Sequence, residues 1–203
     1  METEFKYRLN DEGIFNAIVE NCHQKQYSKD ATEIINMKAE YFDTDDFSLR
    51  NKGIAYRIRY EDDRIIATIK WDIAVKDGLH IREEINLVVN DEYFAEHPDI
   101  ELFKSSDAYE VLYDATQGRP LVKAIDMEYT RRQIMVDTGK SISCISEDRG
   151  CIHHVEGDML PIYELEIEWY HGDEGDFKAL AADIQSTYKL ESEDRSKLQR
   201  AFA

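Results

Sequence analysis

The chain has 203 residues, of which 42% are hydrophobic, and this is enough for one domain with a sizeable core. Asp and Glu outnumber Lys and Arg by 43 to 25, which gives a formal net charge of -18. This charge argues against an open nucleic-acid-binding surface and against docking on an anionic membrane, but it allows a small basic pocket inside an acidic shell.

Targeting and cysteine signals are sparse. No apolar run of about 18 residues predicts a transmembrane helix, and no basic segment followed by an apolar one marks a secretory signal. Cys22, Cys144 and Cys151 form no Cys-x-x-Cys pair, so we expect no structural zinc. We expect a single domain over residues 1–203 in the cytoplasm, as a monomer or a homodimer.

The first expected strand, residues 2–8, carries an alternating row of charges. Side chains at every second position of a strand share a face. The row consists of Glu2, Glu4, Lys6 and Arg8. A face made wholly of charges needs solvent or a charged ligand, and an exposed edge strand that blocks aggregation is the simpler explanation for this strand alone.

The next elements alternate between helix and strand patterns. Apolar residues from Ile14 to Cys22 recur at helical spacing, and residues 33–43 read as a strand. Two strands at 54–60 and 65–71 flank a hairpin turn. The charges that share a face in this hairpin and in the following strand, 79–87, are Arg57, Arg59, Lys70, Arg82 and Glu84.

The second half begins with a break in the strand rhythm. Residues 91–118 predict two short helices. Strands are then expected at 123–136, 141–146, 151–155 and 162–169, with a turn at Asp148-Arg149-Gly150. The last of these strands places three glutamates on one face, and a helix from Phe177 to Tyr188 and a polar tail at 191–200 follow.

Same-face charges thus recur on several strands, each opposite a largely apolar face. If the helices cover the apolar faces, the sheet closes into a barrel with a polar lumen. Buried charges are costly unless they pair or bind a ligand. Arginine and lysine suit phosphate oxygens, whereas clustered carboxylates suit Mg²⁺ or Mn²⁺. The pattern therefore predicts a polyphosphate ligand with a metal, and the alternative is a lumen whose charges only pair with one another.

Eight segments match one known family in order along the whole chain. They are Glu2-Thr3-Glu4-Phe5-Lys6, Tyr41-Phe42-Asp43-Thr44, Tyr56-Arg57-Ile58-Arg59, Ala67-Thr68-Ile69-Lys70, Arg82-Glu83-Glu84, Thr130-Arg131, Glu164-Leu165-Glu166-Ile167-Glu168 and Ser196-Lys197. On these residues the chain resembles the CYTH domain, also called the triphosphate tunnel metalloenzyme superfamily.

The resemblance implies an α+β fold, an eight-stranded antiparallel β-barrel (tunnel) with flanking helices. It also implies metal-dependent hydrolysis of a small triphosphate, with inorganic tripolyphosphate as the first candidate. Phosphate binding is implied for Lys6, Arg57, Arg59, Lys70, Arg82, Arg131 and Lys197. Binding of Mg²⁺ or Mn²⁺ is implied for Glu2, Glu4, Glu164, Glu166 and Glu168. Catalytic roles fall on Glu4, Glu84 and Lys70.

Two departures and three alternatives stay open. Asn86 stands where the family often has a second glutamate, which leaves the metal count and the turnover open. Arg131 and Arg132 face opposite ways on a strand, and the Thr-Arg match favours Arg131. The alternative functions are an adenylate cyclase, for which the chain lacks a His-Phe-Arg or His-Phe-Lys element, a thiamine triphosphatase, and a polyphosphate-binding module without turnover.

Overall fold

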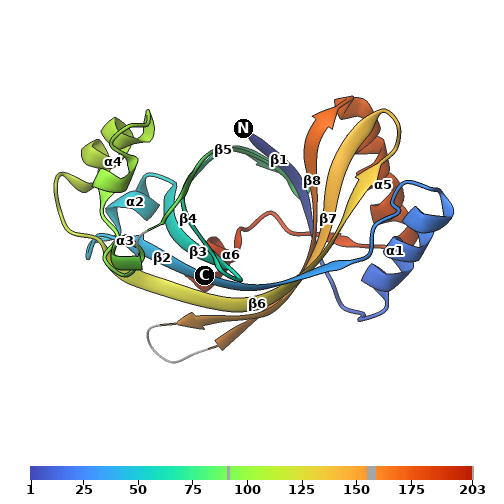
Figure 1. Cartoon of the computed structure of the whole chain (residues 1–203), viewed down its shortest axis with the longest axis horizontal. Coiled ribbons are helices and arrows are strands. Elements are labelled where there is room, and N and C mark those ends of the chain that lie inside the picture. Colours follow the sequence, from blue (N-terminus) through green and yellow to red (C-terminus); the bar gives the residue numbers. More distant parts are fainter. Residues whose placement is uncertain (91, 155–158, 203) are drawn as a thin grey trace.

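The computed structural model describes residues 1–90, 92–154 and 159–202. Eight antiparallel strands form a closed barrel (Figure 1). The strands are β1 (Glu2–Arg8), β2 (Glu33–Asp43), β3 (Ile54–Glu61), β4 (Arg64–Lys76), β5 (Leu79–Val88), β6 (Val122–Asp137), β7 (Ser141–His154) and β8 (Met159–Gly172). Their order is β5-β4-β3-β2-β6-β7-β8-β1, and the pairing of β1 with β5 closes the ring. A short ninth strand, β9 (Glu191–Ser192), pairs with β1 outside it. The predicted α+β class and eight-stranded barrel are confirmed.

The helices flank the barrel on two sides (Figure 1). They are α1 (Ile14–Gln24), α2 (Ser48–Asn51), α3 (Glu92–Glu96), the 3-10 turn η1 (Ile100–Phe103), α4 (Ala108–Thr116), α5 (Glu174–Tyr188) and α6 (Lys197–Ala201). Phe15 of α1 and Phe177 of α5 pack with Tyr7 and Leu165 from the outward faces of β1 and β8. On the other side, α2, η1 and α4 cover the apolar faces of β3 and β4. Burial of these faces leaves the alternate, charged side chains pointing inward.

One part of the interior is apolar, contrary to a lumen that is charged throughout. Met37, Met127, Ile152 and Ile162 are buried and pack against Ala201 of α6. The residues after them on β6, Tyr129 and then Arg131, line the central cavity. Helix α6 therefore packs against one end of the barrel, called here the α6 end. The opposite end, where β1 begins, is called the N-terminal end.

The turn predicted at Asp148-Arg149-Gly150 is wrong, because β7 runs unbroken through it. Gly150 pairs with Tyr129, and a Cβ at this glycine would lie 2.1 Å from the carbonyl oxygen of Glu128. The glycine therefore serves the close approach of two strands, which is one of the roles glycine has inside a sheet. The expected strand ended at Val155, which lies outside the described residues.

The polar tail predicted at 191–200 is also wrong, since β9 and most of α6 lie in it. Ser196 caps α6 by accepting a hydrogen bond from the backbone of Gln199, and the Gln199 side chain bonds back to the backbone of Ser196. This reciprocal cap explains why so short and polar a segment forms a helix turn. Among the described residues, no helix is long and apolar enough to cross a membrane.

Candidate active site

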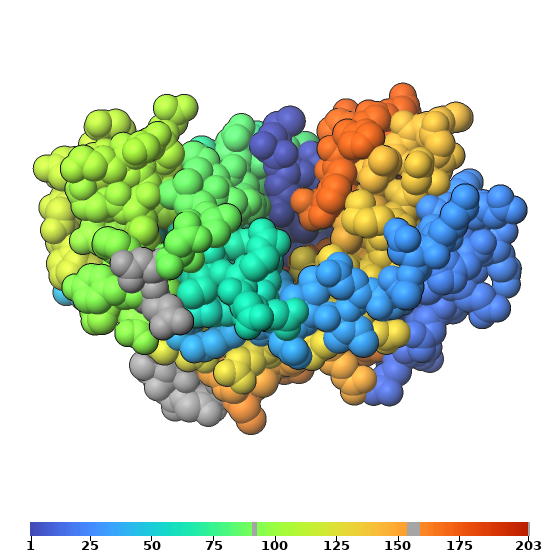
Figure 2. All heavy atoms as spheres, viewed as in Figure 1, coloured from blue at the N-terminus to red at the C-terminus, as the bar shows by residue number. Residues whose placement is uncertain are grey.

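A cavity of about 540 Å³ lies inside the barrel and is lined mainly by charged side chains. The predicted site residues that line it are Glu2, Glu4, Lys6, Arg57, Arg59, Lys70, Arg82, Glu84, Arg131, Glu166, Glu168 and Lys197. Glu164 is fully buried and does not line it. In Figure 2 the N-terminal strand, which supplies Glu2, Glu4 and Lys6, lies between β5 and β8 on one face of the molecule.

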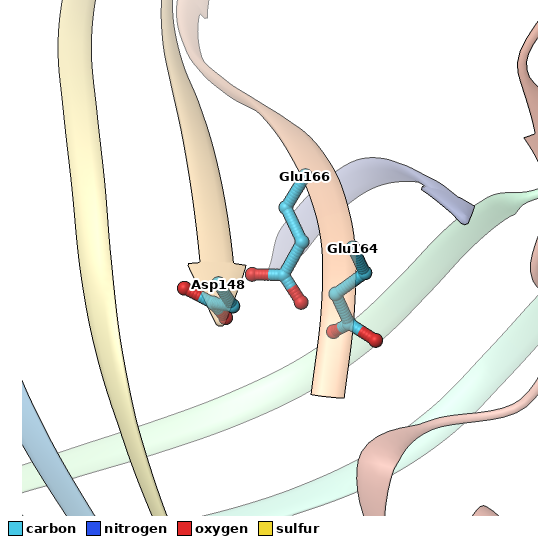
Figure 3. A group of neighbouring side chains, drawn as sticks. All are labelled: Asp148, Glu164 and Glu166. Carbon is cyan, nitrogen blue, oxygen red and sulfur yellow. The ribbon is translucent and has the colours of Figure 1, made fainter. Parts of the chain in front are cut away.

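Three carboxylates gather at the α6 end. Asp148 of β7 and Glu164 and Glu166 of β8 point toward one another (Figure 3), with one oxygen from each within 4.8 Å of the others. The ammonium group of Lys197 contacts all three, at 2.7 Å from Asp148 and 3.0 Å from Glu166. Such a group could hold a metal ion, but here a lysine already occupies its centre.

Arginines complete the neutralisation of this cluster. Arg131 donates from Nε and Nη2 to the two oxygens of Asp148, at 2.7 Å each, and from Nη2 to Glu166 at 2.5 Å. Arg200 donates to Glu164. Burial alone would raise the pKa of Glu166, but Lys197, Lys6 and Arg131 outweigh it and hold that pKa well below its usual value. The three carboxylates, Lys197 and Arg131 are called here the α6-end cluster.

Sequence reasoning missed Asp148 because it was assigned to a turn. Its register partner is Arg131, so an unbroken strand would have placed both on the same inward face. The neighbouring Arg132 points outward to Glu147 at 3.0 Å, with its guanidinium 4.8 Å from the ring centre of Phe15. Arg131 therefore points into the barrel and Arg132 points out of it, as expected for neighbouring residues of a strand.

Lys70 and Glu84 lie toward the N-terminal end and form a second group with Glu2. The Lys70 ammonium lies 2.9 Å from Glu2 and 2.5 Å from Glu84. Asn86 donates from Nδ2 to Glu84 at 2.5 Å and accepts from the Thr68 hydroxyl at 2.6 Å. Burial would raise the pKa of Glu84, but Lys70 and Arg57 outweigh it and, with the Asn86 hydrogen bond, hold it at about 2. Asn86 therefore supplies a donor that a glutamate could not supply.

Glu4 and Lys6 connect the two groups. The Lys6 ammonium lies 3.4 Å from Glu4 and 3.3 Å from Glu166, and both Glu4 and Lys6 are almost fully buried. Arg82 donates from Nη1 to Glu4 at 2.9 Å. Burial would raise the pKa of Glu4, but Lys6 and Arg82 outweigh it, so this pKa is lowered. The alternating charges of β1 thus become one continuous ion-pair network along the wall.

Glu168 differs from every carboxylate above. Within residues 1–90, 92–154 and 159–202 it has no ion-pair or hydrogen-bond partner. Burial, followed by the negative charges of Glu2 and Glu4, raises its pKa to about 7. Burial likewise raises the pKa of Glu2 in spite of Lys70. A carboxylate that lacks a compensating charge is a ligand for a hard divalent cation, so Glu168, together with the nearby carboxylates of Glu2 and Glu4, fits Mg²⁺ or Mn²⁺.

The opposite wall carries cations with spare donors. Arg57 and Arg59 of β3 line the cavity, and β3 is separated from β8 by three strands on either side of the closed ring. Nε of each arginine is buried and has no hydrogen-bond partner in the part of the chain that the structure describes. A buried, unpaired donor is costly. These two donors therefore favour an acceptor that enters the cavity from outside the protein.

Tyr41 lies beside this wall and was given no role by sequence reasoning. Its side chain is buried, and it lines the same cavity as Arg57. Burial would raise its pKa, but Arg57, Lys70 and Lys197 outweigh it and lower that pKa. The Tyr-Phe-Asp-Thr match was the signal that could have pointed to this hydroxyl.

Comparisons with known proteins agree with this architecture. The CYTH domain model matches residues 1–202, and the chain belongs to the CYTH domain family. A comparison with curated protein sequences finds no match.

Two solved structures illustrate the likeness. HpAC1 from Hippeastrum, an adenylyl cyclase candidate described as having a dominant triphosphatase activity, is 17% identical, with a TM-score of 0.73 over 100% of this chain and 95% of that one. A candidate adenylate cyclase from Bacillus halodurans is 20% identical, with a TM-score of 0.64 over 100% of this chain and 98% of that one. At these identities the likeness shows the shared fold.

Proposed function

We propose that this protein hydrolyses a small triphosphate in a metal-dependent reaction, with inorganic tripolyphosphate as the first candidate substrate. One observation carries the proposal. Arg57 and Arg59, each with an unpartnered Nε among the described residues, line one wall of the cavity, and the uncompensated Glu168 lines the other. A phosphate chain with a bound divalent cation satisfies both walls at once.

Each side chain then has a distinct task. Arg57 and Arg59 hold phosphate oxygens, and Lys6, Lys70, Arg131 and Lys197 are further proposed phosphate contacts. When bound, Mg²⁺ or Mn²⁺ neutralises charge on the transferring phosphoryl group. Glu2, Glu4 and Glu168 would hold it. Lowered pKa values keep Glu4 and Glu84 ionised, so either can accept a hydrogen bond from the attacking water and orient it.

The reaction balances without any further reactant. Water adds to a terminal phosphorus, the phosphoanhydride P–O bond breaks, and orthophosphate and pyrophosphate leave. The water's proton passes to solvent. We propose a cytoplasmic protein that acts on a small molecule, without nucleic-acid or membrane partners.

The test is phosphate release from tripolyphosphate, ATP and thiamine triphosphate, with Mg²⁺, with Mn²⁺ and with a chelator. Glu4→Ala and Lys70→Ala are the site variants, and Arg132→Ala, whose side chain points outward, is the matched control. Metal-dependent release that is fastest on tripolyphosphate and lost only in the site variants supports the proposal.

Two other outcomes would replace it. Cyclic AMP formed from ATP would identify a cyclase, the activity that both solved neighbours' names suggest. A rise in melting temperature with tripolyphosphate, but no product with any metal, would identify a binding module.

A further inference from the structure

His80 of β5 is fully buried and belongs to none of the matched segments. Its Nε2 lies 2.9 Å from the backbone carbonyl oxygen of Glu193, and its Nδ1 lies 2.6 Å from Nη2 of Arg82. A carbonyl only accepts and a guanidinium only donates. Both contacts are satisfied at once only by the neutral ring with its proton on Nε2. The two partners therefore select a single tautomer.

Each of the three nitrogens of the Arg82 guanidinium donates to a protein atom. Nε donates to Asp72 at 2.7 Å, Nη1 to Glu4 at 2.9 Å and Nη2 to His80. Its side chain is only 7% exposed. Arg57 and Arg59, by contrast, keep an unpartnered Nε. Arg59 Nη2 lies 2.6 Å from Glu61 and Arg57 Nη2 donates to Thr68, so the β3 arginines are partly paired and keep one donor each for a ligand. Arg82 holds carboxylates of the protein through Nε and Nη1.

The other partner of His80 belongs to the segment that delivers Lys197. The backbone N–H of Glu193 donates to the carbonyl of Lys6 at 3.0 Å, and the Asp194 side chain accepts from the backbone of Gly78 at 2.6 Å. Helix α6 begins at Lys197, four residues after Glu193. His80 therefore contacts, through its two nitrogens, the arginine that holds Glu4 and the segment that inserts Lys197.

We propose that His80 is a positioning residue, which fixes Arg82 on Glu4 through Nδ1 and anchors the C-terminal segment through Nε2. The role assigned to Glu4 rests on the proposed function, whereas the anchoring role does not. Arg82 then orients a metal ligand and does not itself bind phosphate. Burial, followed by the charges of Lys6 and Arg82, lowers the pKa of His80, which agrees with a ring that stays neutral.

Two variants separate the two bonds. In His80→Asn the amide oxygen can replace the Nδ1 acceptor, but no donor reaches Glu193. In His80→Gln the longer amide can replace the Nε2 donor, but no acceptor faces Arg82. A histidine that only fills the core would respond alike to both changes. Asp72→Asn weakens the bond between Arg82 Nε and the partly exposed Asp72. This variant tests the positioning of Arg82 if both histidine variants fail to fold.

Metal affinity tests the Nδ1 bond. Mn²⁺ titration calorimetry of the full chain should show binding at least tenfold weaker in His80→Gln, the usual effect of losing a partner of a metal ligand, and within threefold of wild type in His80→Asn. Asp72→Asn should weaken binding less than His80→Gln. Equal losses in both histidine variants, or wild-type affinity in His80→Gln and Asp72→Asn, would overturn this half of the proposal.

Hydrogen exchange tests the Nε2 bond without any metal or substrate. Backbone amides from Glu193 to Ala201 should exchange at least threefold faster in His80→Asn and at the wild-type rate in His80→Gln. The reverse order would overturn the anchoring role.

If wild-type protein binds Mn²⁺ but releases no phosphate, the proposed function fails while the positioning role stands. If it binds no Mn²⁺, the role toward Glu4 falls together with the metal site, and the exchange result still decides the anchor.

Discussion

The α6-end cluster and the two arginines of β3 are both buried charge groups, but they differ in how completely the protein neutralises them. In the cluster, Asp148 and Glu166 each lie within 3.0 Å of a cationic nitrogen from Lys197 and Arg131. On β3, Nε of Arg57 and of Arg59 has no acceptor among the described residues. Buried charges that satisfy one another are part of the fold, and those that do not are free to bind a ligand.

The largest effect expected from this comparison is on stability, in Asp148→Asn. The change removes a buried negative charge and leaves Arg131 and Lys197 under-compensated. Breaking a buried ion pair in this way lowers the free energy of unfolding by about 3–5 kcal/mol. Urea denaturation without ligand measures it. The control is Glu12→Gln, which removes an exposed ion pair to Arg149 and should leave the free energy of unfolding nearly unchanged. If Asp148→Asn lowers the free energy of unfolding by less than about 1 kcal/mol, the α6-end cluster does not stabilise the fold and does not differ in this way from the β3 arginines.

The next effect is on catalysis, in Arg57→Ala and Arg59→Ala. Loss of a phosphate contact should lower kcat/KM for tripolyphosphate roughly 100-fold, which equals about 2.7 kcal/mol. In Arg59→Ala, stability without substrate should not fall, because burial and the charge of Arg57 already lower the pKa of Arg59. Steady-state kinetics and urea denaturation of the same samples give both values. Arg132→Ala is the matched control, and unchanged kinetics in both β3 variants would contradict the assignment.

A smaller effect concerns Glu168 in the metal-free protein. Its folded pKa of about 7 lies above the ordinary glutamate value of 4.5. The fold therefore favours the protonated carboxyl, so this contribution to stability is full below about pH 4.5 and is lost as the pH rises through about 7. With a chelator present, Glu168→Gln should be more stable than wild type by about 2 kcal/mol at pH 8 and equal to it at pH 4.5. Melting temperatures across this range check the sign. A wild-type protein that gains stability relative to the variant as the pH rises would show that Glu168 has a cationic partner.

Most of the inward-facing charged residues could be predicted from the alternation of side chains along each strand. It placed Arg57, Arg59 and Lys70 on inward faces because a period of two needs only the local chain. The strand 162–169 was also recognised, yet alternation could not separate Glu164 from Glu168. These two lie on one face of β8, but Glu164 meets Lys197 and Arg200 whereas Glu168 faces Glu2 and Glu4. Their difference depends on which residues of the neighbouring strand β1 and of α6 lie beside each glutamate, and no local pattern records that.

The two structural errors had a common source. Asp148-Arg149-Gly150 and the polar tail at 191–200 both have turn-like composition. In the first segment, tertiary strand pairing overrode that composition, because Gly150 pairs with Tyr129 of a distant strand. In the second, the local Ser196–Gln199 capping box was a sequence signal for α6 that was overlooked. Both segments deliver residues of the α6-end cluster, namely Asp148 and Lys197. The neutralised cluster was therefore harder to foresee than the β3 arginines.

The smallest effect expected is at Asn86, which is exposed and donates to Glu84. The lowered pKa of Glu84, about 2, contributes stability that is present above its unfolded value near 4.5 and lost as the pH falls through about 2. Asn86→Ala removes one donor and should cost at most about 1 kcal/mol at pH 7. Asn86→Asp has the same size but places a like charge beside Glu84, so it should be less stable than Asn86→Ala at pH 7 and should lose less stability on acidification. Urea denaturation between pH 3 and 7 compares the two. If Asn86→Asp is as stable as wild type throughout without metal, Glu84 does not depend on this donor, and Lys70 and Arg57 alone account for its ionisation. If the predicted order holds, the asparagine keeps Glu84 ionised within the N-terminal-end group, where a second glutamate would have added an uncompensated charge.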